Sequence, residues 1–228
     1  MILMVHNPRR FDFPQSRHEL ATLNRDEKIS SGPNVRHILI IEGNPDASHE
    51  RLSSALARAY HEGAEAPDCM VQRINVGGIQ FPILRTAKEF ETEPAEEAII
   101  DAQAAFLRAD HIVFIFPLWL GGPPALLKAF MEEVARDHFL IRESDRGFPK
   151  GQLKGRSAEL IVTMGMPPLL YRTLFGAHGV KAFDKSILRM AGISPVQTTY
   201  FGGSDITPPH VGKLIDRARR MGQKAARS

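Results

Sequence analysis

Cysteine, net charge and long apolar runs are all scarce in this sequence of 228 residues. The single cysteine, Cys69, excludes an internal disulfide and is typical of proteins in a reducing compartment. No apolar run approaches the roughly 20 residues that a membrane-spanning helix needs. The N-terminus also lacks the apolar core and cleavage site of a secretory signal. We therefore expect a cytoplasmic protein without membrane insertion.

The charge of the chain is mildly basic, with a net charge of +3 and a pI of about 9.1. Its lysines and arginines are scattered except in one C-terminal cluster. A solvated helix face explains that cluster better than a nucleic-acid surface does, so we expect no nucleic-acid partner. The cluster consists of Lys213, Arg217, Arg219, Arg220 and Lys224.

Several catalytic and metal-binding signatures are absent. The nine histidines include no H-E-x-x-H motif and no close pair with metal-ligand spacing, so we predict no metal site. No G-x-S-x-G nucleophile motif occurs. The segment after Glu42 carries neither the G-x-G-x-x-G dinucleotide fingerprint nor the G-x-x-x-x-G-K-[ST] nucleotide loop.

The clearest local pattern lies in residues 111–134. Residues 111–116 form an apolar run rich in β-branched and aromatic side chains, typical of a strand buried on both faces. Pro117 ends this strand, residues 121–124 form a tight Gly-Gly-Pro-Pro connection, and apolar residues then recur with helical spacing. The stretch is therefore a predicted strand, loop and helix.

Strand and helix patterns alternate five times after residue 34, which predicts an α/β protein with a doubly wound five-stranded parallel sheet and helices on both faces. The strand order 2-1-3-4-5 fits five strands best. Residues 1–34, interrupted by prolines, are predicted to be an N-terminal extension to a single domain at 35–228. The long polar segment 136–155 is predicted to be either a surface loop or part of a site wall. The predicted strands are 35–42, 70–76, 111–116, 157–163 and 196–201, and the predicted helices are about 52–63, 94–107, 123–135, 181–190 and 208–222.

Three loops follow strands that are neighbours in the predicted order, namely 43–53, 117–122 and 163–178. They should converge on one crevice at the carboxyl ends of the strands, where open α/β sheets bind ligands. The first loop is a candidate anion site at a helix N-terminus, although a plain turn capped by Asp46 or Ser48 is the alternative. Its candidate hydrogen-bond donors are Asn44, Ser48, Arg51 and Ser53.

The other two loops carry the aromatic and titratable candidates. Trp119, the only tryptophan, is either a core or interface aromatic or the neighbour of a flat ring cofactor whose polar edge bonds the backbone of 118–120. Tyr171 and His178 could donate hydrogen bonds to a developing negative charge. The alternative is that Tyr171 is a packing residue and His178 a helix cap.

Taken together, these segments resemble the flavodoxin-like NAD(P)H:quinone oxidoreductases of the DT-diaphorase family. Residues 116–119 (FPLW) and 124–130 (PALLKAF) are similar to the family motif F-P-L-x-W-x-x-x-P-A-x-L-K, whose loop holds the flavin ring. Residues 163–165 (TMG) are similar to its Thr-Thr-Gly-Gly turn, and residues 43–45 (GNP) to the A-H-P opening of its phosphate loop. The chain departs from the family at Asn44, which replaces a histidine, and at the shifted aromatic position of Trp119.

The resemblance implies a flavin-dependent enzyme that passes a hydride from NAD(P)H through bound FMN, with FAD as the other option, to a quinone or similar acceptor in ping-pong turnover. It also implies a homodimer, an expectation supported by the apolar residues Phe139, Leu140 and Ile141 in the segment 136–155. Tyr171 and His178 match a tyrosine and a histidine beside the polar edge of the flavin. The implied cofactor-binding residues are Asn44, Ser48, Arg51, Leu52, Ser53, Pro117, Leu118, Trp119, Leu120, Thr163, Met164 and Gly165.

Two other functions remain open at this point. One is an electron-carrier flavodoxin, which a partner reductase would reduce; those carriers are strongly acidic and shorter than this basic chain. The other is a regulatory module, because some members of the family are ancillary subunits of bacterial potassium-efflux systems.

Overall fold

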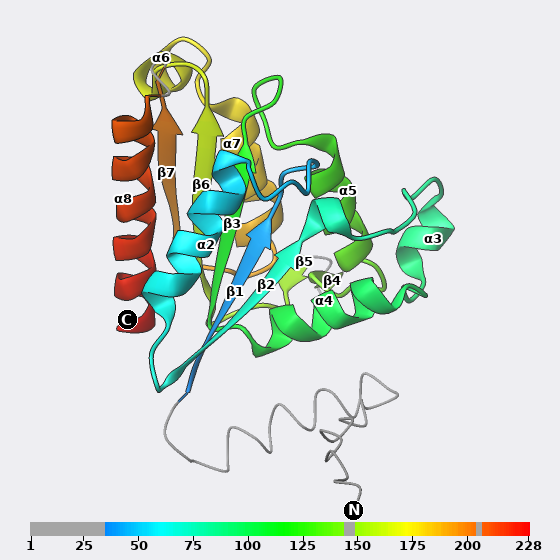
Figure 1. Cartoon of the computed structure of the whole chain (residues 1–228). Helices are drawn as coiled ribbons and strands as arrows, with labels where there is room; N and C mark the ends of the chain where they lie inside the picture. Colours follow the sequence, from blue (N-terminus) through cyan, green and yellow to red (C-terminus); the bar gives the residue numbers. More distant parts are fainter. Residues whose placement is uncertain (1–34, 144–148, 204–206) are drawn as a thin grey trace, which may run out of the picture. The chain divides into compact units, whose positions relative to one another are not determined.

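The structure is a computed structural model that describes residues 35–143, 149–203 and 207–228. The predicted N-terminal extension and part of the segment 136–155 lie outside these residues. Five parallel strands form the central sheet in the order β2-β1-β3-β6-β7 (Figure 1). This order is the predicted 2-1-3-4-5, because β4 and β5 form a separate antiparallel pair. The strands are β1 (Arg36–Glu42), β2 (Cys69–Asn75), β3 (His111–Pro117), β4 (Ile141–Glu143), β5 (Pro149–Gly151), β6 (Ser157–Met164) and β7 (Val196–Gly202).

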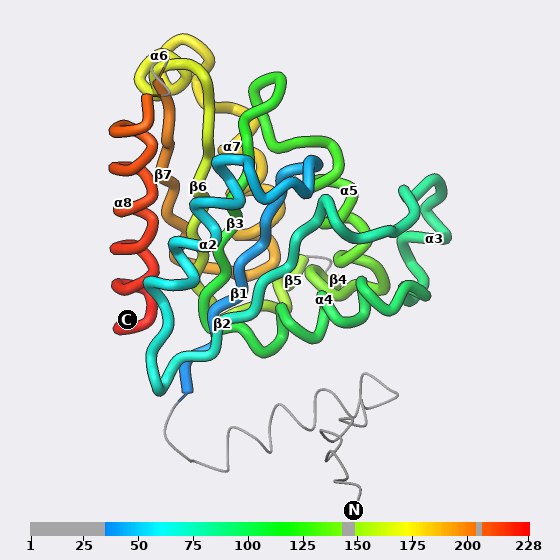
Figure 2. Tube along the Cα trace, in the orientation of Figure 1, coloured from blue at the N-terminus to red at the C-terminus, as the bar shows by residue number. Residues whose placement is uncertain are grey.

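The helices cover both faces of the sheet, as the Cα trace also shows (Figure 2). Two short ones, α3 and α6, were not predicted, since five or six residues are too few for a helical periodicity to be recognised. The predicted helix 181–190 is instead one α-helical turn followed by a π-helical segment, η2. The helical segments are α2 (Leu52–Ala64), η1 (Val76–Gly78), α3 (Ala87–Glu91), α4 (Glu97–Arg108), α5 (Ala125–Val134), α6 (Pro168–Thr173), α7 (His178–Ala182), η2 (Phe183–Arg189) and α8 (Pro208–Ala226).

Two apolar cores lie on opposite faces of the sheet because successive strand residues point to opposite sides. On β1, Leu39 and Ile41 belong to the core beneath α4 and α5, whereas Ile38 and Ile40 belong to the core beneath α2 and α8. β3 is buried on both faces, as its unbroken apolar run predicted. No helix in the described ranges is long and apolar enough to cross a membrane.

The segment 136–155 corrects one expectation. Phe139 and Leu140 are buried in the core of their own chain, and Ile141 packs against that core. They are therefore not surplus apolar residues available to a second subunit. The polar composition of this segment suggested an exposed connection. Its residues instead form the antiparallel β4–β5 pair, and Leu153, which follows this pair, belongs to the same core as Phe139 and Leu140.

Candidate functional site

The three predicted loops do meet at the carboxyl edge of the sheet. The backbone N–H of Gly43, which opens the first loop, donates to the carbonyl of Ile115 in β3 at 2.8 Å. The N–H of Leu118, in the second loop, donates to the carbonyl of Thr163 at 2.7 Å, where the third loop begins. The first two loops are thus each tied to the neighbouring strand, and the second loop is tied to the residue where the third begins, so the predicted convergence is confirmed.

The first loop is organised by its own side chains. Asn44 Oδ1 accepts from the N–H of Asp46 at 3.1 Å, and Asp46 Oδ1 accepts from the N–H of Ser48 at 2.9 Å. Asn44 Nδ2 also donates to Ser53 Oγ at 2.9 Å. The prediction that Asp46 or Ser48 caps the helix is wrong, because both side chains are engaged in turns and α2 begins only at Leu52.

The N-terminus of α2 is left without a side-chain cap. Its N-cap residue, Arg51, has an extended backbone and makes no capping hydrogen bond. The first backbone N–H groups of a helix lack intrahelical partners and attract anions. The uncapped N–H groups of this first turn therefore suit a phosphate group. Ser53 lies buried in the same turn.

Arg51 is already paired within the loop. Its Nε donates to Asp46 Oδ2 at 2.6 Å, and both side chains are substantially exposed. The backbone N–H of Ser48, and next the Arg51 guanidinium, hold the pKa of the Asp46 carboxyl below its usual range. Asp46 is therefore charged at neutral pH and competes with any phosphate for Arg51.

A buried carboxylate at the end of β1 supports this loop, and it was not singled out from the sequence. Glu42 is 3% exposed, and its Oε1 accepts from Arg73 Nε at 3.0 Å. Its Oε2 accepts from Ser54 Oγ, in the first turn of α2, at 3.2 Å. A buried charge of this kind persists only when it is paired. The signal in the sequence was a glutamate closing an apolar strand.

The second loop is a tight turn that projects from β3. Trp119 and Gly122 exchange two backbone hydrogen bonds of 2.9 and 3.0 Å. Between them, Leu120 and Gly121 both have positive φ, at 47° and 82°, which is the pattern of a type I′ turn. Trp119 is 51% exposed and Leu120 fully so. Trp119 is therefore not a core residue, and its ring is available to a ligand or a partner.

The third loop contains α6 and locks the turn in place. The buried Tyr171 hydroxyl donates to the carbonyl of Gly121 at 2.8 Å, and its ring packs edge-on against Tyr200. Burial raises the pKa of Tyr171. A Cβ on Gly179 would lie only 2.2 Å from the same carbonyl oxygen. The turn is thus held between α6 and the start of α7.

His178 is exposed at the first position of α7. The alternative that it caps a helix is wrong, because Ala177 occupies the N-cap position. Thr163 is buried, Met164 is half-buried, and Gly165 is exposed with open space where a side chain would lie. The structure therefore brings both titratable candidates to the loops, but only His178 presents its side chain to solvent.

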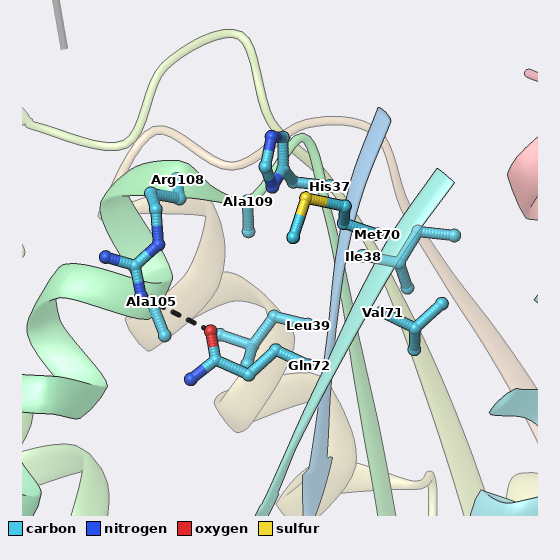
Figure 3. A pocket seen from close by; sticks show the side chains of 9 residues that line it. All are labelled: His37, Ile38, Leu39, Met70, Val71, Gln72, Ala105, Arg108 and Ala109. Carbon is cyan, nitrogen blue, oxygen red and sulfur yellow. Dashed lines mark hydrogen bonds between the residues drawn. The ribbon is translucent and has the colours of Figure 1, made fainter. Parts of the chain in front are cut away.

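One cavity in the described part of the chain lies away from these loops. A hollow of about 210 Å³ sits between β2 and α4, where Arg108 Nη2 donates to Gln72 Oε1 at 3.4 Å (Figure 3). His37 and Met70 line it from the amino-terminal halves of β1 and β2. The candidate loops leave the opposite ends of the strands, so this hollow is not part of the site. The described residues also contain no cluster of potential metal ligands.

The residues at the carboxyl edge fit a phosphate-bearing ring cofactor. The uncapped helix with its polar loop can accept an anion, and the exposed turn at 118–121 offers backbone groups and an indole ring. Open space beside Gly121 and Gly165 leaves room for a ring. This is the arrangement that flavodoxin-like sheets use for a flavin nucleotide.

Residues 36–224 match a protein family described as having a flavodoxin-like fold. The chain belongs to this family. Among its flavodoxin-like relatives, an FMN-dependent NADH:quinone oxidoreductase 2 of Listeria innocua is 27% identical over 207 residues, covering 83% of this chain and 97% of its own length. An FMN-dependent NADH:quinone oxidoreductase of Caldicellulosiruptor saccharolyticus is 29% identical over 200 residues, covering 83% and 98%.

Solved structures agree on the fold. An FMN-dependent NADH-azoreductase of Bacillus anthracis, in complex with FMN, superimposes with a TM-score of 0.65 at 18% identity, covering 85% of this chain and 99% of the other. The predicted flavodoxin-like class is therefore confirmed.

Proposed function

We propose that the protein is an FMN-dependent NAD(P)H:quinone oxidoreductase. The observation that carries the proposal is the meeting, at one edge of the sheet, of an uncapped helix N-terminus and an exposed tryptophan turn. Relatives named for this activity align with this chain over 97% and 98% of their own length.

The reaction requires the transfer of two electrons and two protons. When bound, FMN would supply the chemistry of accepting a hydride, two electrons and one proton, from NAD(P)H and of passing it to a quinone, which takes up the second proton from water. The protein binds and orients the reactants and stabilises charge. We propose that the first loop holds the phosphate through Asn44, Ser48, Arg51, Leu52 and Ser53, and that the ring lies against Pro117, Leu118, Trp119, Leu120, Thr163, Met164 and Gly165.

Tyr171 and His178 are the proposed donors to negative charge at the polar edge of the ring. The two side chains differ in whether their protons are available to a ligand. The single proton of the Tyr171 hydroxyl is donated to Gly121, so this hydroxyl would have to change partners to serve a ligand. The exposed imidazole of His178 would not. His178 is therefore the better candidate for a direct role.

The proposal extends to assembly, location and kinetics. A homodimer would cover the exposed Trp119 and Leu120 side chains, which a monomer leaves in water. A cytoplasmic location is consistent with the free thiol of Cys69. If NAD(P)H and the quinone occupy the same place in turn, the kinetics are ping-pong and double-reciprocal plots are parallel.

The test is an absorption spectrum of the purified protein with mass analysis of the released cofactor. We expect one FMN per chain and NAD(P)H oxidation that depends on an added quinone. Protein that releases no flavin, and whose apo form binds neither FMN nor FAD, would contradict the proposal. Light scattering measures the subunit number, for which a mass near 25.4 kDa at all concentrations excludes the dimer.

A further inference from the structure

The C-terminal segment concentrates the positive charge of the chain. Residues 208–228 contain six lysines and arginines and one aspartate, a net charge of +5, whereas the whole chain is +3. That aspartate, Asp216, accepts from Arg219, which also donates to Glu62 in α2. Arg219 is thus neutralised within the fold, and five cations remain.

These five cations form one exposed stripe. They are spaced by four, three, four and three residues, which places them on a single helix face. The opposite face of α8 is packed closely on α2, since a Cβ on Gly222 would lie 2.0 Å from the carbonyl oxygen of Tyr60. The stripe runs for roughly 21 Å at 1.5 Å per residue. Its members are Lys213, Arg217, Arg220, Lys224 and Arg227, all of them exposed.

A second feature lies at the N-terminal end of α8. Leu169 and Leu174 are each 70% exposed, and Leu170 and Phe175 are 44% and 50% exposed, so α6 and the residues after it present four large apolar side chains to water. Arg172 lies among them and is also exposed.

The end of β7 lies beside α6 and leads into the segment before α8 (Figure 1). A Cβ on Gly202 would lie 2.4 Å from the carbonyl of Met166, just before α6. The neighbouring Gly203 faces His210 in the first turn of α8, at 3.9 Å from its would-be Cβ. The segment that carries the apolar side chains therefore lies beside the N-terminal end of α8, the end at which the basic stripe begins.

We propose that the basic stripe and the apolar side chains of residues 169–175 together form a docking surface for an anionic lipid bilayer. A basic stripe is attracted to lipid phosphates, and apolar side chains beside it enter the boundary between headgroups and acyl chains. A nucleic acid would match the stripe but would leave the four apolar side chains in water. The bilayer satisfies both features, which is why we favour it.

Docking also has a consequence for catalysis, which rests on the proposed function. Quinones with apolar tails dissolve in bilayers, and α6 is bonded to the proposed cofactor loop through Tyr171 and Gly121. A protein docked through α6 would therefore hold its acceptor site beside the lipid that contains the acceptor.

The experiment is co-sedimentation of the full chain with vesicles. Vesicles of phosphatidylcholine with 30% phosphatidylglycerol should bind the protein, pure phosphatidylcholine vesicles should bind it far more weakly, and added salt should release it. The variant Arg220→Gln/Lys224→Gln should lose affinity by about fivefold for each charge removed. Its matched control is Lys88→Gln/Lys150→Gln, which removes two exposed charges elsewhere and should bind like the parent.

The apolar part has its own pair of variants. Leu169→Ser should weaken binding to the anionic vesicles, whereas Ile83→Ser, at another exposed apolar residue outside the proposed surface, should not. Circular dichroism confirms that each variant is folded. Equal binding of the parent protein to anionic and neutral vesicles would overturn the proposal. So would equal binding to anionic vesicles by each test variant and its control variant.

Three further results identify the wrong partner or the wrong function. If a DNA duplex binds more tightly than the vesicles at the same salt, and the α8 variant loses that binding, the surface serves nucleic acid and the proposal fails. If Leu169→Ser alters the subunit number but not vesicle binding, a second copy covers α6 and the proposal also fails. Vesicle binding without quinone reduction would overturn the proposed function and leave the docking surface standing.

Discussion

The hydroxyl of Tyr171 donates a 2.8 Å hydrogen bond to the carbonyl oxygen of Gly121. The two residues are 50 positions apart in the sequence, and their bond fastens α6 to the turn that carries Trp119. Leu120, a non-glycine residue in the left-handed region, shows that this turn is under conformational constraint. The position of the indole ring therefore depends on a residue outside its own loop.

The variant Tyr171→Phe should loosen the turn without unfolding the protein, because it removes one hydrogen bond worth about 1 kcal/mol and keeps the ring. Trp119 is the only tryptophan, so its fluorescence and its quenching by acrylamide report on the turn directly. We expect greater quenching and about tenfold slower flavin reduction by NAD(P)H in stopped flow, with a normal flavin content.

The comparison is His178→Gln, which should slow flavin reduction by about tenfold and leave Trp119 quenching unchanged. Slower reduction by Tyr171→Phe without any change at Trp119 would instead assign this tyrosine a direct donor role. If both single variants and the double variant reduce as fast as the parent, neither residue serves the reaction.

Arg51→Ala should weaken FMN binding, because charge-assisted hydrogen bonds to phosphate are among the stronger ones. The expected loss is about 1.5 kcal/mol, the lower end for a hydrogen bond to a charged group, since Asp46 must first release Arg51. Asp46→Asn should tighten binding, and Arg51→Ala should cost more in that background. Titration of apo protein with FMN gives the dissociation constants. Equal constants for the parent and Arg51→Ala would place the phosphate elsewhere.

Gly179→Ala should displace the tryptophan turn, because the new Cβ would meet the Gly121 carbonyl at 2.2 Å. We expect weaker FMN binding and a lower free energy of unfolding. Gly212→Ala is the control: nothing lies within 4 Å of its would-be Cβ in α8, and it should gain about 0.5–1 kcal/mol. Urea unfolding measures both. A Gly179→Ala protein as stable as the parent, with unchanged FMN affinity, would show that the close approach is not needed.

His111 should make stability depend on pH. Burial, and next the nearby Arg36 charge, lower the pKa of His111 to about 4. Its ring lies between Ser157 Oγ, 2.8 Å from Nδ1, and the Tyr60 hydroxyl, 3.3 Å from Nε2. Because the folded state disfavours the charged ring, this contribution is present above the unfolded pKa of about 6.5 and is lost as pH falls towards 4. The loss amounts to at most about 3 kcal/mol.

Urea unfolding between pH 4 and pH 8 measures this dependence, and His111→Gln is the variant that should flatten it. The neighbouring Glu159 has a pKa raised chiefly by burial, so its own contribution has the opposite sign and favours the folded state at low pH. A His111→Gln protein with the same pH profile as the parent would rule out the histidine as the source.

The sequence by itself determined the architecture. Each strand and long helix is encoded by a local period of apolar residues, and five alternations of strand and helix leave few possible topologies. For the same reason the apolar run at 111–116 identified the central strand, and the convergence of three loops followed from the strand order alone. The motif at 116–130 indicated the family because it lies within one continuous stretch.

Only the tertiary structure decided which side chains are partners. Asp46 and Ser48 are good helix caps by composition, yet α2 starts later and their oxygens form turns instead. Phe139 and Leu140 look exposed in a polar segment but are buried by residues that follow them. The Tyr171–Gly121 bond joins two loops that approach each other only because β3 and β6 are adjacent. Such pairings depend on distances across the folded chain, which a local sequence period does not encode.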